Sequence, residues 1–393
     1  MAIREAKRIQ QVEEYYFSTK LNEIRDIEKT GEKVINLGIG NPDLPPSHST
    51  IDALKNSATQ TENHGYQSYK SSDDLREAIS DFYKNTYDVR LDAETEILPL
   101  KGSKEGILII SMAFLNSGDV VLVPNPGYPT YTAASRMMDA EIQYYDLKEE
   151  NGWQVDVDDL KKTDLSRVKI MWINYPNMPT GAVASIELFN ELTKLAAEYN
   201  FLLCNDNPYS LVLNNDPKSF LSADGAKVAG LELNSLSKSH HMAGWRIGWA
   251  AGNRKYIKSI LKVKSNIDSG IFLPIQHAAI EALKNSEKWH KERNSEMYRR
   301  REKVFSLLDQ LNCTYDKNQV GMFVWAKFPE GFIGAKSFVD EILHQARVFI
   351  TPGFVFGSNG ERYVRVSLCN SIQKIDEAIL RIKKYFQLKM ESK

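Results

Sequence analysis

The chain has 393 residues, a length that suggests about two domains and allows a large buried core. Its 50 basic and 51 acidic residues nearly cancel, so the composition shows no electrostatic footprint for a nucleic acid or a membrane surface. A small, roughly neutral or anionic substrate fits this composition better.

The cysteines and the first residues of the chain indicate a cytoplasmic protein. Cys204, Cys313 and Cys369 lie far apart, lack metal-ligand spacing and cannot all pair within one chain. The first stretch, MAIREAKRIQQVEEYY, contains no apolar segment of the kind found in export signals, and no later stretch is long enough to span a bilayer. We therefore expect a protein of the reducing cytoplasm, with no metal site and no membrane partner.

The first two thirds of the chain alternate between strand and helix patterns. Residues 9–30 have helical spacing, residues 34–40 (VINLGIG) predict a strand that ends in glycines, and residues 73–87 predict an amphipathic helix with acidic residues in its first turn. Further helices are predicted after Gly102, after Pro129 and over 185–199. They separate the apolar runs EILPL, DVVLVP, EIQYYDL, VKIMWINYP, FLLCND and LELNSLS. This alternation predicts a mostly parallel sheet that is covered by helices on both faces.

The pattern changes after residue 252. Long helical segments are predicted over 254–264, 274–283 and 287–311. A smaller mixed unit follows, with MFVWAKF, a helix over 335–346, VFITPG, YVRVSL and a C-terminal helix. Two packed units joined by a long helix account for this pattern.

One stretch, SLSKSHHMAGWRIGW at 235–249, combines a lysine with groups that bind phosphate. Lys238 lies between small hydroxyl residues, and Arg246 follows eight positions later. Ser235, Ser237 and the forked guanidinium of Arg246 suit an oxyanion. A lysine acts as a nucleophile only when it leaves bulk water, where its ammonium stays protonated. The stretch therefore indicates a site for a phosphorylated aldehyde bound to Lys238, with an ordinary solvated lysine as the alternative.

Five of the predicted strands are followed by polar or aromatic residues that could form one site. In an open parallel sheet, ligands bind beyond the carboxyl ends of the strands. Each of these residues alone is compatible with a cap, a turn or a packed aromatic, but their order along successive strands favours one shared site. The residues at the five strand ends are Ser103 and Lys104, Tyr128, Asn177, Asp206 and Tyr209, and the Lys238 stretch.

This order of motifs resembles the pyridoxal-phosphate enzymes of fold type I, in particular the class I and II aminotransferases related to aspartate aminotransferase. The resemblance covers nearly the whole chain and rests on the S-x-S-K-x(7)-R-x-G spacing and the upstream N-D-x-x-Y element. It implies an α/β fold with a large helix-covered sheet and a smaller α+β domain built from both chain ends. The implied bounds are 1–40 for the arm and part of the small domain, 41–275 for the large cofactor-binding domain, and 276–393 for the connecting helix and the small C-terminal domain.

The resemblance also implies pyridoxal 5'-phosphate as cofactor and assigns residues to it. Lys238 would bind the cofactor covalently and act as the base, Asp206 would pair with the ring nitrogen, and Tyr209 would lie beside the ring hydroxyl. Tyr128 would stack on the ring. The phosphate would be bound by Ser103, Lys104, Ser235, Ser237 and Arg246.

The substrate and a partner subunit have their own implied residues. Arg365, in YVRVSL, would bind the α-carboxylate of the substrate, with the Gly40 backbone opposite. Tyr66 would reach the phosphate in the partner subunit, which implies a homodimer with shared sites. Met178 replaces the asparagine of the usual Asn-Pro-Thr-Gly motif, so the neighbouring Asn177 is expected to supply the missing amide. Ser71 stands where relatives of this kind often have glycine.

The implied activity is the transfer of an amino group between an L-amino acid and a 2-oxo acid in a ping-pong reaction, with glutamate and 2-oxoglutarate as the expected pair. Lys104 either binds a distal carboxylate, which favours glutamate or aspartate, or only contacts the phosphate. Residues 265–272 (SNIDSGIF) resemble aminotransferases grouped with LL-diaminopimelate aminotransferase. An exposed Asp268 would suit the extra amino group of that substrate, with a cap of the following helix as the alternative. A carbon–sulfur β-lyase on the same scaffold is the alternative enzyme. A cofactor-binding regulator is the non-catalytic alternative, although no helix-turn-helix or basic patch supports it.

Overall fold

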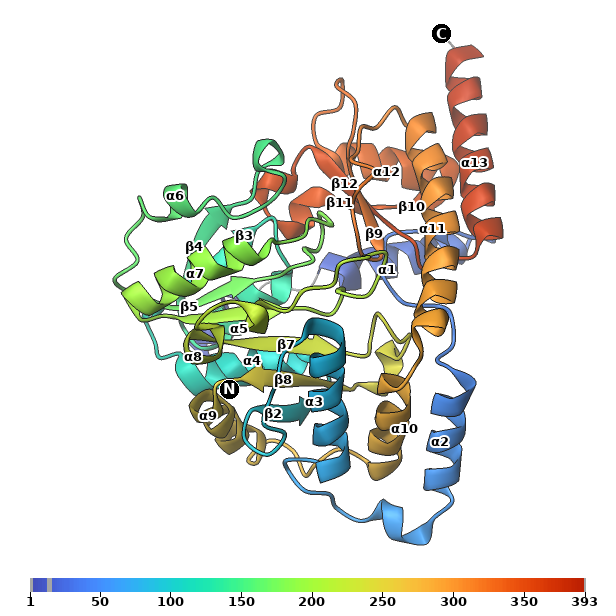
Figure 1. Cartoon of the computed structure of the whole chain (residues 1–393). Coiled ribbons are helices and arrows are strands. Elements are labelled where there is room, and N and C mark those ends of the chain that lie inside the picture. The colour runs from blue at the N-terminus through green and yellow to red at the C-terminus, as the bar shows by residue number, and fades with distance from the viewer. Residues whose placement is uncertain (1–2, 13–15, 392–393) are drawn as a thin grey trace.

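The computed structural model describes residues 3–12 and 16–391, and within them a seven-stranded sheet is covered by helices on both faces (Figure 1). The strand order is β2-β8-β7-β6-β5-β3-β4. The strands are β2 (Ile97–Leu100), β3 (Val120–Asn125), β4 (Glu141–Asp146), β5 (Val168–Ile173), β6 (Leu202–Asp206), β7 (Gly230–Ser235) and β8 (Gly248–Gly252). Strands β3 to β7 are parallel, which confirms the predicted mostly parallel sheet.

Strand β8 was not predicted from the sequence. It runs antiparallel between β2 and β7, where Leu98 pairs with Ala250 and Leu233 also pairs with Ala250. Its sequence, GWAAG, lacks the branched apolar residues that make a strand recognisable. The pairing with two neighbours therefore decides its conformation.

Successive residues of a strand point to opposite faces of the sheet, and both sets of residues are apolar here, so both faces are buried. On β3, Val121 and Val123 belong to one buried cluster and Leu122 to another. The helices of the first cluster are α4 (Ser103–Phe114), α5 (Pro129–Met137) and α9 (Arg254–Lys264). Those of the second are α3 (Asp73–Tyr87), α7 (Ile186–Tyr199), α8 (Ala226–Ala229) and α10 (Leu273–Leu283).

A second unit is built from both ends of the chain (Figure 1). Strand β1 (Ile35–Asn36) pairs in parallel with β10 (Val348–Phe349), and β11 (Thr351–Pro352), β12 (Tyr363–Ser367) and β9 (Phe323–Lys327) form an antiparallel sheet. The helices of this unit are α1 (Tyr16–Glu28), α11 (Glu287–Gln310), α12 (Ala335–Ala346) and α13 (Ile372–Glu391). Buried Leu37 and Phe349 share one core, so the expected fold class is confirmed. The exact bounds 1–40, 41–275 and 276–393 stay a prediction.

Some predicted elements differ from the structure in length. The strand expected over 34–40 is confined to β1 (Ile35–Asn36), and the helical pattern of 9–30 becomes α1 (Tyr16–Glu28), with residues 13–15 outside the described part of the chain. Two further helices are α2 (His48–Ala58) and α6 (Val157–Leu160). Among the described residues, no helix combines the length and the apolar character needed to cross a bilayer.

Candidate active site

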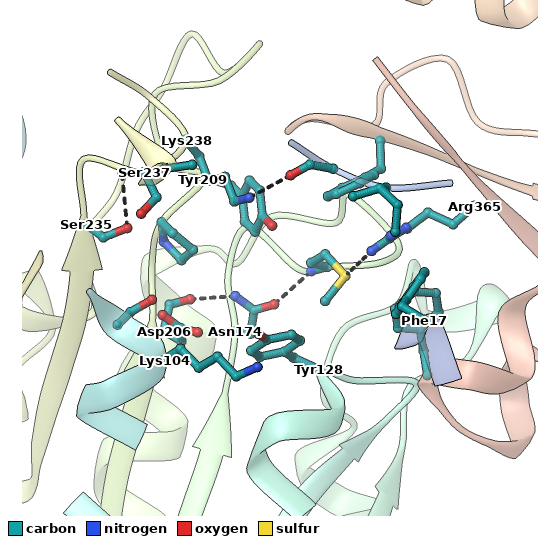
Figure 2. A pocket seen from close by; sticks show the side chains of 18 of the residues that line it. Phe17, Lys104, Tyr128, Asn174, Asp206, Tyr209, Ser235, Ser237, Lys238 and Arg365 are labelled. Atoms are coloured by element: carbon teal, nitrogen blue, oxygen red, sulfur yellow. Dashed lines mark hydrogen bonds between the residues drawn. The ribbon is translucent and has the colours of Figure 1, made fainter. Parts of the chain in front are cut away.

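A cavity of about 720 Å³ lies where the carboxyl ends of the strands of the large sheet meet the second unit. It brings together residues from many separate parts of the chain, including most of those that the sequence had singled out (Figure 2). The predicted residues that line it are Gly40, Ser103, Lys104, Tyr128, Asp206, Tyr209, Ser235, Ser237, Lys238, Arg246 and Arg365. Two predicted residues, Asn177 and Tyr66, are not among the lining residues.

Lys238 follows the end of β7 and points into the cavity (Figure 2). Its Nζ donates a hydrogen bond to the carbonyl oxygen of Gly40 at 2.9 Å. Burial lowers the pKa of Lys238, and the nearby guanidinium groups of Arg365 and Arg246 act in the same direction. A lower pKa raises the fraction of neutral amine, which is the form that acts as nucleophile and base.

Asp206 is the last residue of β6 and its side chain is buried. The Tyr131 hydroxyl donates a hydrogen bond to Oδ2 of Asp206 at 3.0 Å. Burial raises the pKa of Asp206 to about 7, although the hydroxyls of Tyr131 and Ser103 oppose that change. The other oxygen, Oδ1, is buried and has no hydrogen-bond partner among the described residues. A protonated nitrogen facing this oxygen would satisfy it and favour the carboxylate.

Near Asp206, the cavity residues Ser103, Lys104 and Arg246 form a place that suits a phosphate. Ser103 begins α4, whose first N–H groups are free for an anion. Gly102 has φ +91°, and a Cβ there would lie only 2.4 Å from Nη2 of Arg246, so the close approach of this guanidinium requires glycine. Burial lowers the pKa of Lys104, and the Arg246 charge adds to this effect. An anion between Arg246 and Lys104 would relieve the repulsion between the two cations.

Arg365 lies at the other end of the cavity, in the middle of β12 (Figure 2). Its Nη2 donates to the carbonyl oxygen of Gly38 at 2.8 Å, and its Nη1 contacts Sδ of Met178 at 3.1 Å. The guanidinium carbon lies 3.9 Å from the ring centre of Phe323 and 4.6 Å from that of Phe356. These contacts hold a planar cation in a fixed orientation, as bidentate carboxylate binding requires.

Asn177 was expected to supply an amide to the cavity, but it is not among the residues that line it, and its buried Nδ2 has no hydrogen-bond partner among the described residues. Its Oδ1 accepts hydrogen bonds from the backbone N and Oγ1 of Thr180, at 3.2 and 2.8 Å. Asn174 lines the cavity instead, and the sequence interpretation missed it. The Nδ2 of Asn174 donates to the carbonyl oxygen of Asp206 at 2.5 Å, while its Oδ1 accepts from the backbone N of Met178 at 2.8 Å. The signal was present, because Asn174 directly follows β5 and strand ends carry the site.

The aromatic residues around the cavity occupy the positions that the sequence order predicted. Tyr128 follows β3 and packs edge-on against Tyr131, with ring centres 5.7 Å apart. Tyr209 follows β6, and burial raises the pKa of Tyr209, so its hydroxyl remains a proton donor. Tyr66 is 93% exposed and lies outside the cavity of its own chain.

The comparison with protein families decides the class of this site. Residues 32–382 match the family described as aminotransferase class I and II. The chain belongs to this family. The matched segment includes every cavity residue named above.

Similar proteins agree in fold and in the kind of reaction. The LL-diaminopimelate aminotransferase of Dehalococcoides mccartyi is 40% identical over 379 residues, which cover 96% of this chain and 97% of the relative. The transaminase BacF of Bacillus subtilis is 38% identical over 371 residues, with 94% and 93% of the two chains covered. A solved apo structure of BacF has a TM-score of 0.93 at 36% identity and covers 98% of each chain.

The protein is therefore a pyridoxal-phosphate-dependent aminotransferase with amino acid and 2-oxo acid substrates. These relatives carry aminotransferase names, so the carbon–sulfur β-lyase alternative has no support. The cavity also fits the cofactor by its own geometry. The unsatisfied Oδ1 of Asp206 suits a protonated ring nitrogen, and the close approach of Arg246 to Gly102 leaves a cationic cradle beside a helix N-terminus.

Proposed function

We propose that this aminotransferase carries an amino group from an L-amino acid to a 2-oxo acid in two half-reactions, with glutamate and 2-oxoglutarate as one substrate pair. One observation carries the proposal. A partly buried lysine of lowered pKa and a buried, oriented arginine face the same cavity from its two ends. This arrangement supports a base and a carboxylate clamp that act on one amino acid substrate.

The residues would divide the work as follows. Arg365 binds the α-carboxylate and so sets which bond at the substrate Cα stands ready to break. When bound, pyridoxal phosphate supplies the electron sink for the charge left at that carbon. The Nζ of Lys238 removes the proton from Cα and later returns it. Asp206 keeps a proton on the ring nitrogen, and Arg246 with the start of α4 holds the phosphate.

The amino donor is a separate question from the reaction. Relatives named LL-diaminopimelate aminotransferase, 38–40% identical, favour LL-diaminopimelate as donor. Transaminase BacF matches almost as well and does not carry that name, so identity at this level does not select one donor. Lys104 lines the cavity, which keeps a distal carboxylate, as in glutamate or aspartate, among the candidates.

The reaction is tested by initial-rate kinetics with an amino donor and 2-oxoglutarate. We expect parallel double-reciprocal lines, because the first product leaves before the acceptor binds.

Lys238→Ala should abolish transfer and should no longer retain the cofactor on the protein after borohydride reduction. Lys255→Ala, a change of an exposed lysine, is the matched control and should leave both unchanged. Borohydride fixation of the cofactor in Lys238→Ala would overturn the assignment.

We also propose a homodimer in which Tyr66 serves the phosphate of the partner subunit. Tyr66 and Tyr69 are 93% and 45% exposed, and Phe272, whose ring lies 5.6 Å from that of His64, is 41% exposed. Exposed aromatic residues on adjoining loops are typical of an interface.

We propose, in addition, that the protein works in the reducing cytoplasm, and its three free, buried thiols support this proposal.

Mixed dimers test whether the site is shared. In a hybrid of Tyr66→Ala and Lys238→Ala subunits, one site would carry both changes and the other neither. Mixing two poorly active variants should therefore restore activity toward half of that of the unchanged dimer. If Tyr66 acted within its own chain, both sites of the hybrid would be defective and no activity would return.

A further inference from the structure

The Arg365 end of the cavity is lined by hydrocarbon. Phe17 lies next to Arg365, on the far side of the cavity from Lys238 and Ser235 (Figure 2). Its ring centre lies 5.7 Å from the guanidinium carbon of Arg365. Phe323, Phe356 and Met178 also contact the Arg365 guanidinium. Two more apolar residues line the cavity, Leu21 one helical turn after Phe17 and Ile39 directly after Gly38, whose carbonyl oxygen accepts from Arg365. We refer to this set of apolar residues as the wall.

Helix α1 holds its part of this wall in place. Phe17 and Leu21 are four residues apart and therefore lie on one face of the helix. Lys20 is buried, and its Nζ forms ion pairs with Asp340 of α12 at 2.9 Å and with Glu23 at 2.7 Å. This anchor fixes the rotation of α1 against the second unit. Leu21 remains 38% exposed although it lines the cavity, so it presents apolar surface that a ligand can cover.

The charges that this chain itself contributes to the cavity leave this end without a partner for a distal ammonium. Among the described residues that line it, the only carboxylate is Asp206, which lies at the ring-nitrogen position and not beside Arg365 (Figure 2). A charged group placed against Phe17 and Leu21 would lose its hydration without compensation. An apolar side chain placed there would instead gain by leaving water.

We infer that this wall binds the side chain of the amino donor, and that the preferred donor is an apolar or aromatic L-amino acid of the leucine, methionine or phenylalanine class. The inference rests on the proposed function, because Arg365 must hold the α-carboxylate for the side chain to emerge among these residues. A preference for such a donor differs from a specificity for LL-diaminopimelate, because the side chain of LL-diaminopimelate ends in an ammonium and a carboxylate.

Donor kinetics with the purified holoenzyme test the inference. With 2-oxoglutarate as the common acceptor, we compare five amino donors: leucine, methionine, phenylalanine, aspartate and LL-diaminopimelate. We expect kcat/KM for the best apolar donor to exceed that for LL-diaminopimelate by at least about tenfold. An equal or higher value for LL-diaminopimelate would overturn the inference and leave the proposed aminotransfer intact. Absence of transfer from every donor would overturn both.

Substitution of Leu21 tests the wall by binding rather than by turnover. The probes are carboxylic acids without an amino group, 3-phenylpropanoate and 4-methylpentanoate, whose inhibition constants are compared with that of glutarate. Leu21→Glu should weaken the two apolar acids by about 10-fold to 200-fold. The control Thr19→Glu adds the same charge to an exposed position of α1 outside the cavity and should change none of the constants. Unchanged inhibition by the apolar acids in Leu21→Glu, with an unaltered Tm, would contradict the role of this wall.

Discussion

At the residue scale, one physical cause tunes two groups of the site in opposite directions. Burial lowers the pKa of the Lys238 amine and raises that of the Asp206 carboxyl to about 7, because each charged form loses hydration. Lys238 then has more of the neutral form that takes up a proton. Asp206 is poised to ionise as soon as a cation faces its unsatisfied Oδ1. The two side chains are thus prepared for different tasks by the same loss of water.

Asp206→Asn should separate cofactor binding from turnover. Asparagine keeps the size of the side chain and an oxygen for the Tyr131 hydroxyl, which lies 3.0 Å from Oδ2 of Asp206. It cannot hold a proton on the ring nitrogen by charge, so we expect near-stoichiometric cofactor but a kcat lower by about 100-fold or more. Cofactor release in alkali and steady-state rates measure the two quantities. A near-normal kcat would contradict the role assigned to Asp206.

At the scale of elements, the buried carboxylate of Glu232 links β7 to neighbouring elements by hydrogen bonds. Glu232 of β7 is fully buried and accepts hydrogen bonds from Tyr83 of α3 and from Asn205 of the neighbouring β6, both at 3.0 Å. It also accepts from Ser219 Oγ and from the backbone N of Phe220, both at 2.8 Å. Asn205 precedes Asp206, so this network supports the strand that carries the Asp206 carboxylate of the cavity.

Glu232→Leu should destabilise the fold more than it perturbs the chemistry. The substitution leaves several buried donors without an acceptor, and we expect the free energy of unfolding to fall by about 2–4 kcal/mol. Glu232→Gln retains acceptor capacity and should cost less. Urea denaturation measures the change, with the exposed Glu198→Gln as control. Equal stability of Glu232→Leu and the unchanged protein would show that the network contributes nothing.

At the scale of the whole molecule, a buried imidazole cluster joins the lysine segment to the long helix α11. The rings of His240 and Trp289 are stacked with centres 5.9 Å apart, and His290 meets His240 edge-on at 5.0 Å. Burial lowers the pKa of His240 and brings those of His241 and His290 to about 4. Asp43, Arg293 and Arg300 also lie near His241.

This cluster predicts a loss of stability in mild acid. In the unfolded chain a histidine titrates near pH 6.5, so between about pH 6.5 and 4 the unfolded state binds more protons than the folded state. The free energy of unfolding should therefore decrease as the pH falls through this window, by up to about 1.4 kcal/mol per pH unit for each histidine. Chemical denaturation at several pH values measures the slope. His290→Asn should flatten it between pH 6.5 and 5, and an unchanged slope would contradict this origin.

The sequence by itself determined most of the elements and most of the site motifs. The helices predicted over 73–87, 254–264 and 335–346 coincide with α3, α9 and α12, because periodicity and capping residues are local signals. The order of residues after successive strands placed Lys238 and Asp206 in one site for the same kind of reason: parallel strands end at one edge of a sheet.

Tertiary structure alone decided the contacts between distant segments and the direction of side chains in irregular loops. Strand β8 follows from pairing with two neighbours rather than from its own residues. In the loop after β5, packing turned the Asn177 side chain toward Thr180, which spacing along the chain cannot reveal. The position of Phe17 beside Arg365 depends on how α1 docks on the second unit through Lys20. Local sequence therefore specified the motifs of the site, whereas the apolar wall proposed to bind the donor side chain exists only after both ends of the chain have packed together.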